Sequence, residues 1–150
     1  MFNMTNPEAK RLFDKGMDAL SQGSILNALS CFENALSAED DPLVSSFYAF
    51  CIAKERGEFQ KAISICNASI SRDPGNSLHY LNLGKIHLLK RDNKEAISVF
   101  RQGMSFEENR QIADELNRLG TRKPPVIPFL KRSNIVNKYL GLLLSRLKLR

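Results

Sequence analysis

The sequence has no tryptophan and little cysteine or histidine: three Cys and two His among 150 residues. An odd number of cysteines without paired spacing argues against a disulfide framework. Residues 1–13 also lack the basic start and apolar run of a secretory leader. We therefore expect a chain that works in the reducing cytoplasm, with cysteines that are structural thiols.

Long hydrophobic runs and catalytic motifs are missing as well. The longest apolar stretch that suggests membrane insertion covers residues 139–144, far fewer than the roughly 20 of a spanning helix. The sequence has no glycine-rich phosphate loop and no triad arrangement. His79 and His87 stand eight residues apart on one predicted helix, which places them on different faces. The sequence therefore predicts no enzyme activity, no cofactor and no metal site.

Acidic residues are absent from the last part of the chain, residues 121–150. Residues 1–120 carry 14 Lys and Arg and all 16 Asp and Glu, a net charge of −2, whereas residues 121–150 carry eight basic residues and a net charge of +8. A change of sign this sharp predicts a boundary near Gly120. We therefore expect two parts with different roles: a domain over 1–120 and a basic, proline-containing segment over 121–150.

An internal repeat of 34 residues runs through the first part. Ala28, Ala62 and Ala96 stand 34 positions apart in similar apolar surroundings. Apolar residues within each unit recur at intervals of three and four, which is the period of a helix, so each unit is predicted to be a pair of helices. Three further columns keep the same spacing: Gly16, Phe50 and Gly84; Phe32, Cys66 and Phe100; and Gly23, Gly57 and Arg91.

The columns indicate how each pair is built. Small residues recur where two helices cross closely, so we expect Ala28 and Ala96 to face Gly16 and Gly84. The column that holds Arg91 falls where the chain turns between two helices. The predicted helices span residues 7–21, 25–38, 43–56, 59–71, 77–90 and 94–105, and a capping helix follows over 107–119.

The third unit carries the residues that best define the pattern, namely Tyr80, Leu83-Gly84, His87, Ala96 and Phe100. They resemble the tetratricopeptide repeat. The resemblance covers residues 9–110, in units of about 9–42, 43–76 and 77–110. It implies an all-α fold: a right-handed α-solenoid of three helix-turn-helix repeats with a capping helix, followed by a C-terminal amphipathic helix.

Members of this family are scaffolds and adaptors that bind other proteins, and the first helix of each repeat lines a concave groove for a partner peptide. Carried over position by position, the resemblance implies a groove lined by Lys10, Phe13, Met17, Leu20, Val44, Phe47, Cys51, Lys54, Leu78, Leu81, Lys85 and Leu88. Most of these residues are apolar, which favours an apolar peptide or helix as the partner. The alternative is that some of them pack between neighbouring hairpins.

A well-known pocket of this family is a clamp of Lys, Arg and Asn around the C-terminal carboxylate of chaperones. Its two asparagine positions hold Met17 and Tyr48 in this sequence. We therefore do not expect this chain to use that clamp.

Helical periodicity resumes after three prolines, over residues 134–149. Its apolar side carries Val136, Leu140, Leu143, Leu144 and Leu147. An apolar, basic helix can cover the scaffold, pair with a second copy of the chain, or lie on an anionic membrane surface. We favour the first two because segment 78–89 is apolar on nearly all sides and needs a cover. Membrane binding stays as the alternative, and no nucleic-acid motif accompanies the basic residues.

Overall fold

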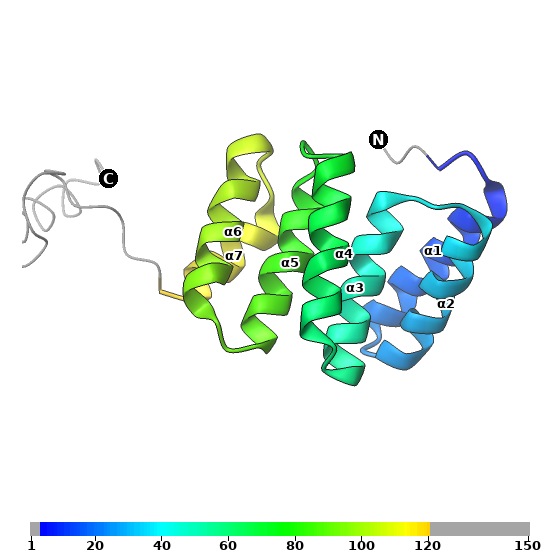
Figure 1. Ribbon diagram of the computed structural model, residues 1–150, viewed down its shortest axis with the longest axis horizontal. Helices are drawn as coiled ribbons and strands as arrows, with labels where there is room; N and C mark the ends of the chain where they lie inside the picture. The colour runs from blue at the N-terminus through cyan, green and yellow to red at the C-terminus, as the bar shows by residue number, and fades with distance from the viewer. Residues whose placement is uncertain (1–3, 121–150) are drawn as a thin grey trace, which may run out of the picture. The chain divides into compact units, whose positions relative to one another are not determined.

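The computed structural model describes residues 4–120, in which helices are joined by short connections and no strand occurs (Figure 1). The helices are α1 (Pro7–Ser21), α2 (Ile25–Ala38), α3 (Pro42–Arg56), α4 (Phe59–Arg72), α5 (Ser77–Leu89), α6 (Asn93–Phe106) and α7 (Arg110–Arg118). The first six helices confirm the predicted ranges to within one residue at each end. Each hairpin lies beside the next in chain order, which gives the described residues the architecture of an α-solenoid.

The capping helix begins three residues later than predicted. Glu107 has an extended backbone, with φ −151° and ψ 137°, and ends α6. Asn109 then caps α7, because its side-chain oxygen accepts hydrogen bonds from the backbone N–H groups of Gln111 at 2.9 Å and Ile112 at 3.2 Å. Glu107 and Glu108 therefore belong to the connection between α6 and α7.

The turn inside each hairpin uses the predicted column of Gly23, Gly57 and Arg91. All three residues are left-handed, with φ of 75°, 69° and 65°. Glycine adopts this conformation without strain, whereas a residue with a Cβ atom does not. The third hairpin therefore holds an arginine in a conformation that favours glycine.

Inside the outer hairpins, a glycine on the first helix faces a phenylalanine on the second. A Cβ atom built at Gly16 would lie less than 3.0 Å from three ring atoms of Phe32, and one built at Gly84 would meet Phe100 in the same way. The nearest side chains are therefore these rings and not the alanines that we predicted to face the glycines. In the middle hairpin the large and the small residue change places: its first helix carries Phe50, and its second helix carries Cys66.

Neighbouring hairpins are held together by two different contacts. Rings of Phe13, Phe32 and Phe47 meet between the first hairpin and α3, with centroids 5.6 to 5.8 Å apart. Between α3 and α5 the side-chain amide of Asn82 donates a 3.1 Å hydrogen bond to Ser46 Oγ, and both residues are buried. The first contact is bulky and apolar, and the second is small and polar.

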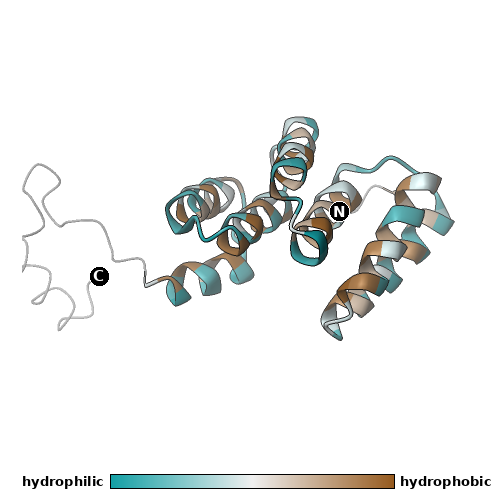
Figure 2. Ribbon diagram, turned by 60° about the horizontal axis from the view of Figure 1, so that its bottom comes forward, coloured by the Kyte–Doolittle hydropathy of each residue, from teal (hydrophilic) through white to brown (hydrophobic). Residues whose placement is uncertain are grey.

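Helix α5 is the most completely buried helix of the described chain. It packs against α3, α4 and α6, so these helices cover the segment that the sequence singled out as apolar on nearly all sides. Figure 2 shows the apolar residues on the helices and mainly polar or neutral residues in the connections. The argument that the C-terminal segment must supply this cover is therefore wrong.

Several expectations fall on residues 121–150, which lie outside the described part. They are the amphipathic helix over 134–149 and its roles in covering the scaffold, in pairing with a second copy and in membrane binding. Within residues 4–120, no helix is long and apolar enough to cross a membrane.

Candidate functional site

Some residues that the resemblance assigns to the groove are buried in the core. Five of them expose 6% of their surface or less: Phe13, Val44, Phe47, Cys51 and Leu81. A side chain without exposed surface offers a partner nothing to contact. These five residues therefore pack within the scaffold and leave a partner almost no surface to contact.

The remaining predicted residues keep accessible surface. Two lysines are exposed, and the other five side chains are half-buried. Equivalent repeat positions contribute to this set, because Leu20, Lys54 and Leu88 follow one another at intervals of 34 residues. We call the seven side chains, all on α1, α3 and α5, the first-helix face: Lys10, Met17, Leu20, Lys54, Leu78, Lys85 and Leu88.

One aromatic residue next to this face was missed. The ammonium nitrogen of Lys54 lies 5.7 Å from the centroid of the Phe50 ring, and that of Lys85 lies 5.8 Å from the same centroid. A ring attracts a cation through the negative charge of its face. We call Phe50, Lys54 and Lys85 the Phe50 cluster. Its signal was present in the sequence, since Phe50 stands where the other two repeats have glycine.

Positive charge in the Phe50 cluster is weakly compensated. Burial lowers the pKa of Lys85, the field of Glu115 on α7 opposes this effect, and the nearby charge of Lys54 adds to it. Among residues 4–120, neither lysine has a carboxylate oxygen within 4.0 Å. Glu115 is instead paired with Arg118, at 3.3 Å. The cluster therefore combines an aromatic ring with two ammonium groups that lack a direct anionic partner in the described chain.

The third hairpin and the fold are both similar to those of known proteins. Residues 80–110 match the family model of the tetratricopeptide repeat. The third hairpin therefore carries a tetratricopeptide repeat. Among solved structures, the first such domain of Spaghetti (RPAP3), bound to the HSP90 peptide SRMEEVD, is 20% identical, with a TM-score of 0.63 over 78% of this chain and 96% of that chain.

Two further tetratricopeptide-repeat domains have the same fold. The Sgt2 domain from Aspergillus fumigatus is 19% identical, with a TM-score of 0.63 over 88% of this chain and 94% of that chain. The second domain of human RPAP3, in complex with the HSP70 peptide SGPTIEEVD, is 20% identical, with a TM-score of 0.58 over 77% of this chain and 97% of that chain. These likenesses establish the fold of the described residues.

Two of the three cysteines, Cys51 and Cys66, are buried. Burial raises the pKa of the Cys51 thiol to about 12, and it raises that of Cys66 to about 12 as well. Cys66 Sγ lies 3.8 Å from the backbone oxygen of Ser46, inside the core. Both thiols are therefore protonated at neutral pH, which leaves them without the thiolate that a nucleophile needs.

The two histidines lie on α5 and are both buried. His79 Nε2 is 3.6 Å from Asp73 Oδ2, and neither ring nitrogen of His79 has a hydrogen bond. Burial lowers the pKa of His79 and also that of His87. Both imidazoles are therefore neutral at pH 7. Residues 4–120 contain no group of three or more His, Cys, Asp and Glu side chains that could hold a metal ion.

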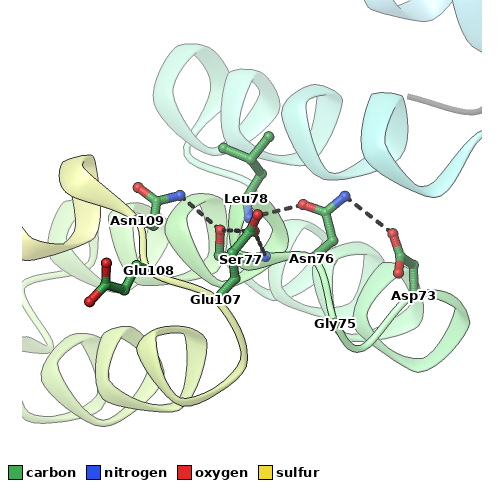
Figure 3. A pocket seen from close by; sticks show the side chains of 8 residues that line it. All are labelled: Asp73, Gly75, Asn76, Ser77, Leu78, Glu107, Glu108 and Asn109. Atoms are coloured by element: carbon green, nitrogen blue, oxygen red, sulfur yellow. Dashed lines mark hydrogen bonds between the residues drawn. The ribbon is translucent and has the colours of Figure 1, made fainter. Parts of the chain in front are cut away.

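A polar cavity of about 490 Å³ lies where the α6–α7 connection meets the start of α5 (Figure 3). Ser77 Oγ donates a 2.7 Å hydrogen bond to Glu107 Oε2, and Asn109 Nδ2 donates to Ser77 Oγ at 2.9 Å. Asn76 Nδ2 donates to Asp73 Oδ2 at 3.1 Å. Most of the polar side chains around the cavity are thus bonded to one another, and they join α7 to α5. We regard this region as structural.

Proposed function

We propose that this chain is a non-enzymatic scaffold that binds an apolar segment of a partner protein on the first-helix face. The observation that carries the proposal is the set of half-buried apolar side chains on the first helices, Met17, Leu20, Leu78 and Leu88, which lie against the core and keep accessible surface. Covering the remaining surface of each would contribute roughly 0.5 to 1.5 kcal/mol at about 25 cal/mol per Å². Solved domains of the same fold bind peptides, which supports a protein segment as the ligand.

The proposed mode of binding differs from recognition of a free C-terminal carboxylate. The clamp positions that would hold asparagine carry Met17 and Tyr48, and both side chains pack against the core. Neither side chain has the amide group that would donate two hydrogen bonds to a carboxylate. The ligand is therefore an internal segment that supplies apolar side chains at helical spacing.

The test uses peptide ligands selected by the full chain. A displayed library of random peptides of about 15 residues, or four helical turns, is panned on the immobilised protein, and the recovered peptides are titrated against variants. Met17→Asp and Leu88→Asp should each weaken binding about tenfold or more, because each places a charge where the partner's apolar side chain is desolvated. Phe47 and Leu81 are unsuitable targets, since both are buried in the core.

The matched control is Leu26→Asp. Leu26 lies on the second helix α2 and is 63% exposed, so the same substitution there should leave both folding and peptide binding unchanged. Urea unfolding of each variant separates lost binding from lost structure. Peptides that bind all three variants as tightly as the parent protein, or a library that yields no ligand, would refute the proposed function.

A second role is proposed for residues 121–150, which have a net charge of +8 and contain no Asp or Glu. Such a segment would attach the scaffold to anionic lipid, with about 1 kcal/mol from each basic residue near the surface. Sedimentation with phosphatidylserine vesicles tests this role, and full-length protein that stays in the supernatant at low salt would rule it out.

A further inference from the structure

The two joints between neighbouring hairpins differ in polarity. The first joint, where the first hairpin meets α3, contains the rings of Phe13, Phe32 and Phe47. No polar side chain of α1 or α2 is buried. The second joint, where α5 packs against α3 and α4, contains the buried side chains of Asn82 and His79. The second joint therefore holds a buried group that can take up a proton near neutral pH.

His79 faces the second hairpin. It precedes Asn82 by three residues, so both lie on the same side of α5, and the Asn82 side chain is bonded to Ser46 on α3. Burial lowers the pKa of His79, and the charges of Asp73, which follows α4, and Asp41, which caps α3, oppose this effect. The carboxylate that follows α6 is bonded to the start of α5 instead. The charges that act on His79 thus come from the second hairpin.

Neither carboxylate accepts a hydrogen bond from the His79 ring in this arrangement. Asp73 Oδ2 lies 3.6 Å from Nε2 and accepts a hydrogen bond from Asn76 Nδ2 at 3.1 Å. Asp41 Oδ1 accepts from backbone N–H groups at the start of α3. Within the described chain, neither ring nitrogen of His79 has a hydrogen-bond partner. An imidazolium has two N–H donors and a charge, so protonation is costly while the joint stays closed.

We propose that the second joint is a pH-sensitive switch: when His79 takes up a proton, the third hairpin and α7 separate from the second hairpin, and the first two hairpins stay together. Opening lets water hydrate the imidazolium, and it also hydrates Asn82 and Ser46, which lose their mutual hydrogen bond. The rings at the first joint gain nothing from contact with water, so that joint stays closed.

The experiment follows the full chain by NMR between pH 7.5 and 5.5. Exchange of the Asn82 side-chain amide protons with water reports opening, because this side chain is buried and bonded to Ser46 in the closed joint. The rate is divided at each pH by that of the exposed Asn67, which removes the intrinsic pH dependence of amide exchange. Ring signals of His79 show whether the imidazole is protonated.

The variant His79→Gln is compared with the control His87→Gln. His87 is also a buried histidine of α5, but the charged groups that act on its pKa belong to the third hairpin itself. The two substitutions therefore remove the same kind of group from the same helix, and only the first removes it from the second joint.

In the parent protein, the exchange ratio of Asn82 should rise up to about tenfold from pH 7.5 to 5.5, since opening takes up one proton and a hydrated histidine has a pKa of about 6.5. The rise should be absent in His79→Gln and retained in His87→Gln. Buried backbone amides of α1 and α2 should keep their protection over the same range.

The contrary results are equally clear. An exchange ratio that stays constant while the His79 ring becomes protonated would mean that the closed joint accepts the charge, and a constant ratio without protonation would exclude the switch as well. An equal rise in His79→Gln, or its loss in His87→Gln, would assign the opening to another cause. Equal loss of protection in α1 and α2 would indicate unfolding of the whole domain. If His79→Gln does not fold, the parent protein still decides, because the rise must begin near pH 6.5 and must be absent above it.

Discussion

The contact between Gly84 and Phe100 gives a direct test of how the hairpins are packed. Both residues are buried, and a Cβ atom at position 84 would lie less than 3.0 Å from three atoms of the Phe100 ring. Phe100 has no exposed surface, so protein atoms enclose its ring on all sides. The substitution Gly84→Ala therefore forces an overlap between α5 and α6.

Two opposing effects set the magnitude. Alanine is favoured over glycine inside a helix by about 1 kcal/mol. Inserting one extra carbon into a close-packed core costs about 1 to 3 kcal/mol, and the overlap with three ring atoms places this site at the upper end. The net effect is a loss of about 2 kcal/mol in the free energy of unfolding, which corresponds to a decrease in Tm of about 7 °C for a domain of this size.

Urea unfolding followed by circular dichroism measures this loss, with Gly75→Ala as the control. Gly75 has no heavy atom within 4 Å of a built Cβ and no positive φ, so its substitution should be neutral or slightly stabilising. Placing the residue pair of the middle hairpin, Phe on the first helix and Cys on the second, in the third hairpin gives a second check. Gly84→Phe should be severely destabilising alone, and adding Phe100→Cys should recover part of the loss. A Gly84→Ala protein as stable as the parent would refute the packing argument.

Three further predictions concern single residues. Arg91→Gly should raise the free energy of unfolding by about 1 kcal/mol, because Arg91 has a left-handed φ of 65°; a decrease in urea unfolding would contradict this. Burial lowers the pKa of His79 from 6.5 despite the opposing charges of Asp73 and Asp41, so the unfolded chain binds the proton more readily and stability should fall as pH drops below 6.5. His79→Gln should reduce this slope in unfolding measured from pH 7.5 to 5.5, and an unchanged slope would disprove it. A thiol reagent at pH 8 should modify Cys31 in the folded protein but spare Cys51 and Cys66 until the chain is denatured. Equal modification rates for the three thiols would contradict the burial of Cys51 and Cys66.

The repeat and its helices were predictable because their signals are local. The spacing of 34 residues fixed the number of hairpins, and intervals of three and four fixed the apolar side of each helix. The start of α7 was predicted wrongly because Asn109 was not recognised as its cap, although Asn is among the strongest capping residues.

Which side chains of each first helix stay exposed was not predictable from one repeat, because it depends on the side-chain volumes in the neighbouring repeat. Ser46, Ala49 and Ala53 are small and buried on α3, and they lie on the helix that α5 packs against. Close approach of α5 then buries Leu81 at a position that a wider spacing would leave open. A position-by-position transfer from the family does not take into account which helices pack against each first helix in this chain.

Phe50 shows why departures from the repeat carry information about both fold and function. With Cys66 small on the second helix, the middle hairpin carries its large side chain on the first helix instead. A ring on the first helix remains half-buried, whereas Phe32 and Phe100 on second helices are fully buried. The exchange therefore moves an aromatic surface to where Lys54 and Lys85 reach it. Reversing it with Phe50→Gly and Cys66→Phe should keep the solenoid folded and remove the ring. A free energy of unfolding in urea far below that of the parent protein would show that Phe50 has a packing role that Phe at position 66 does not replace.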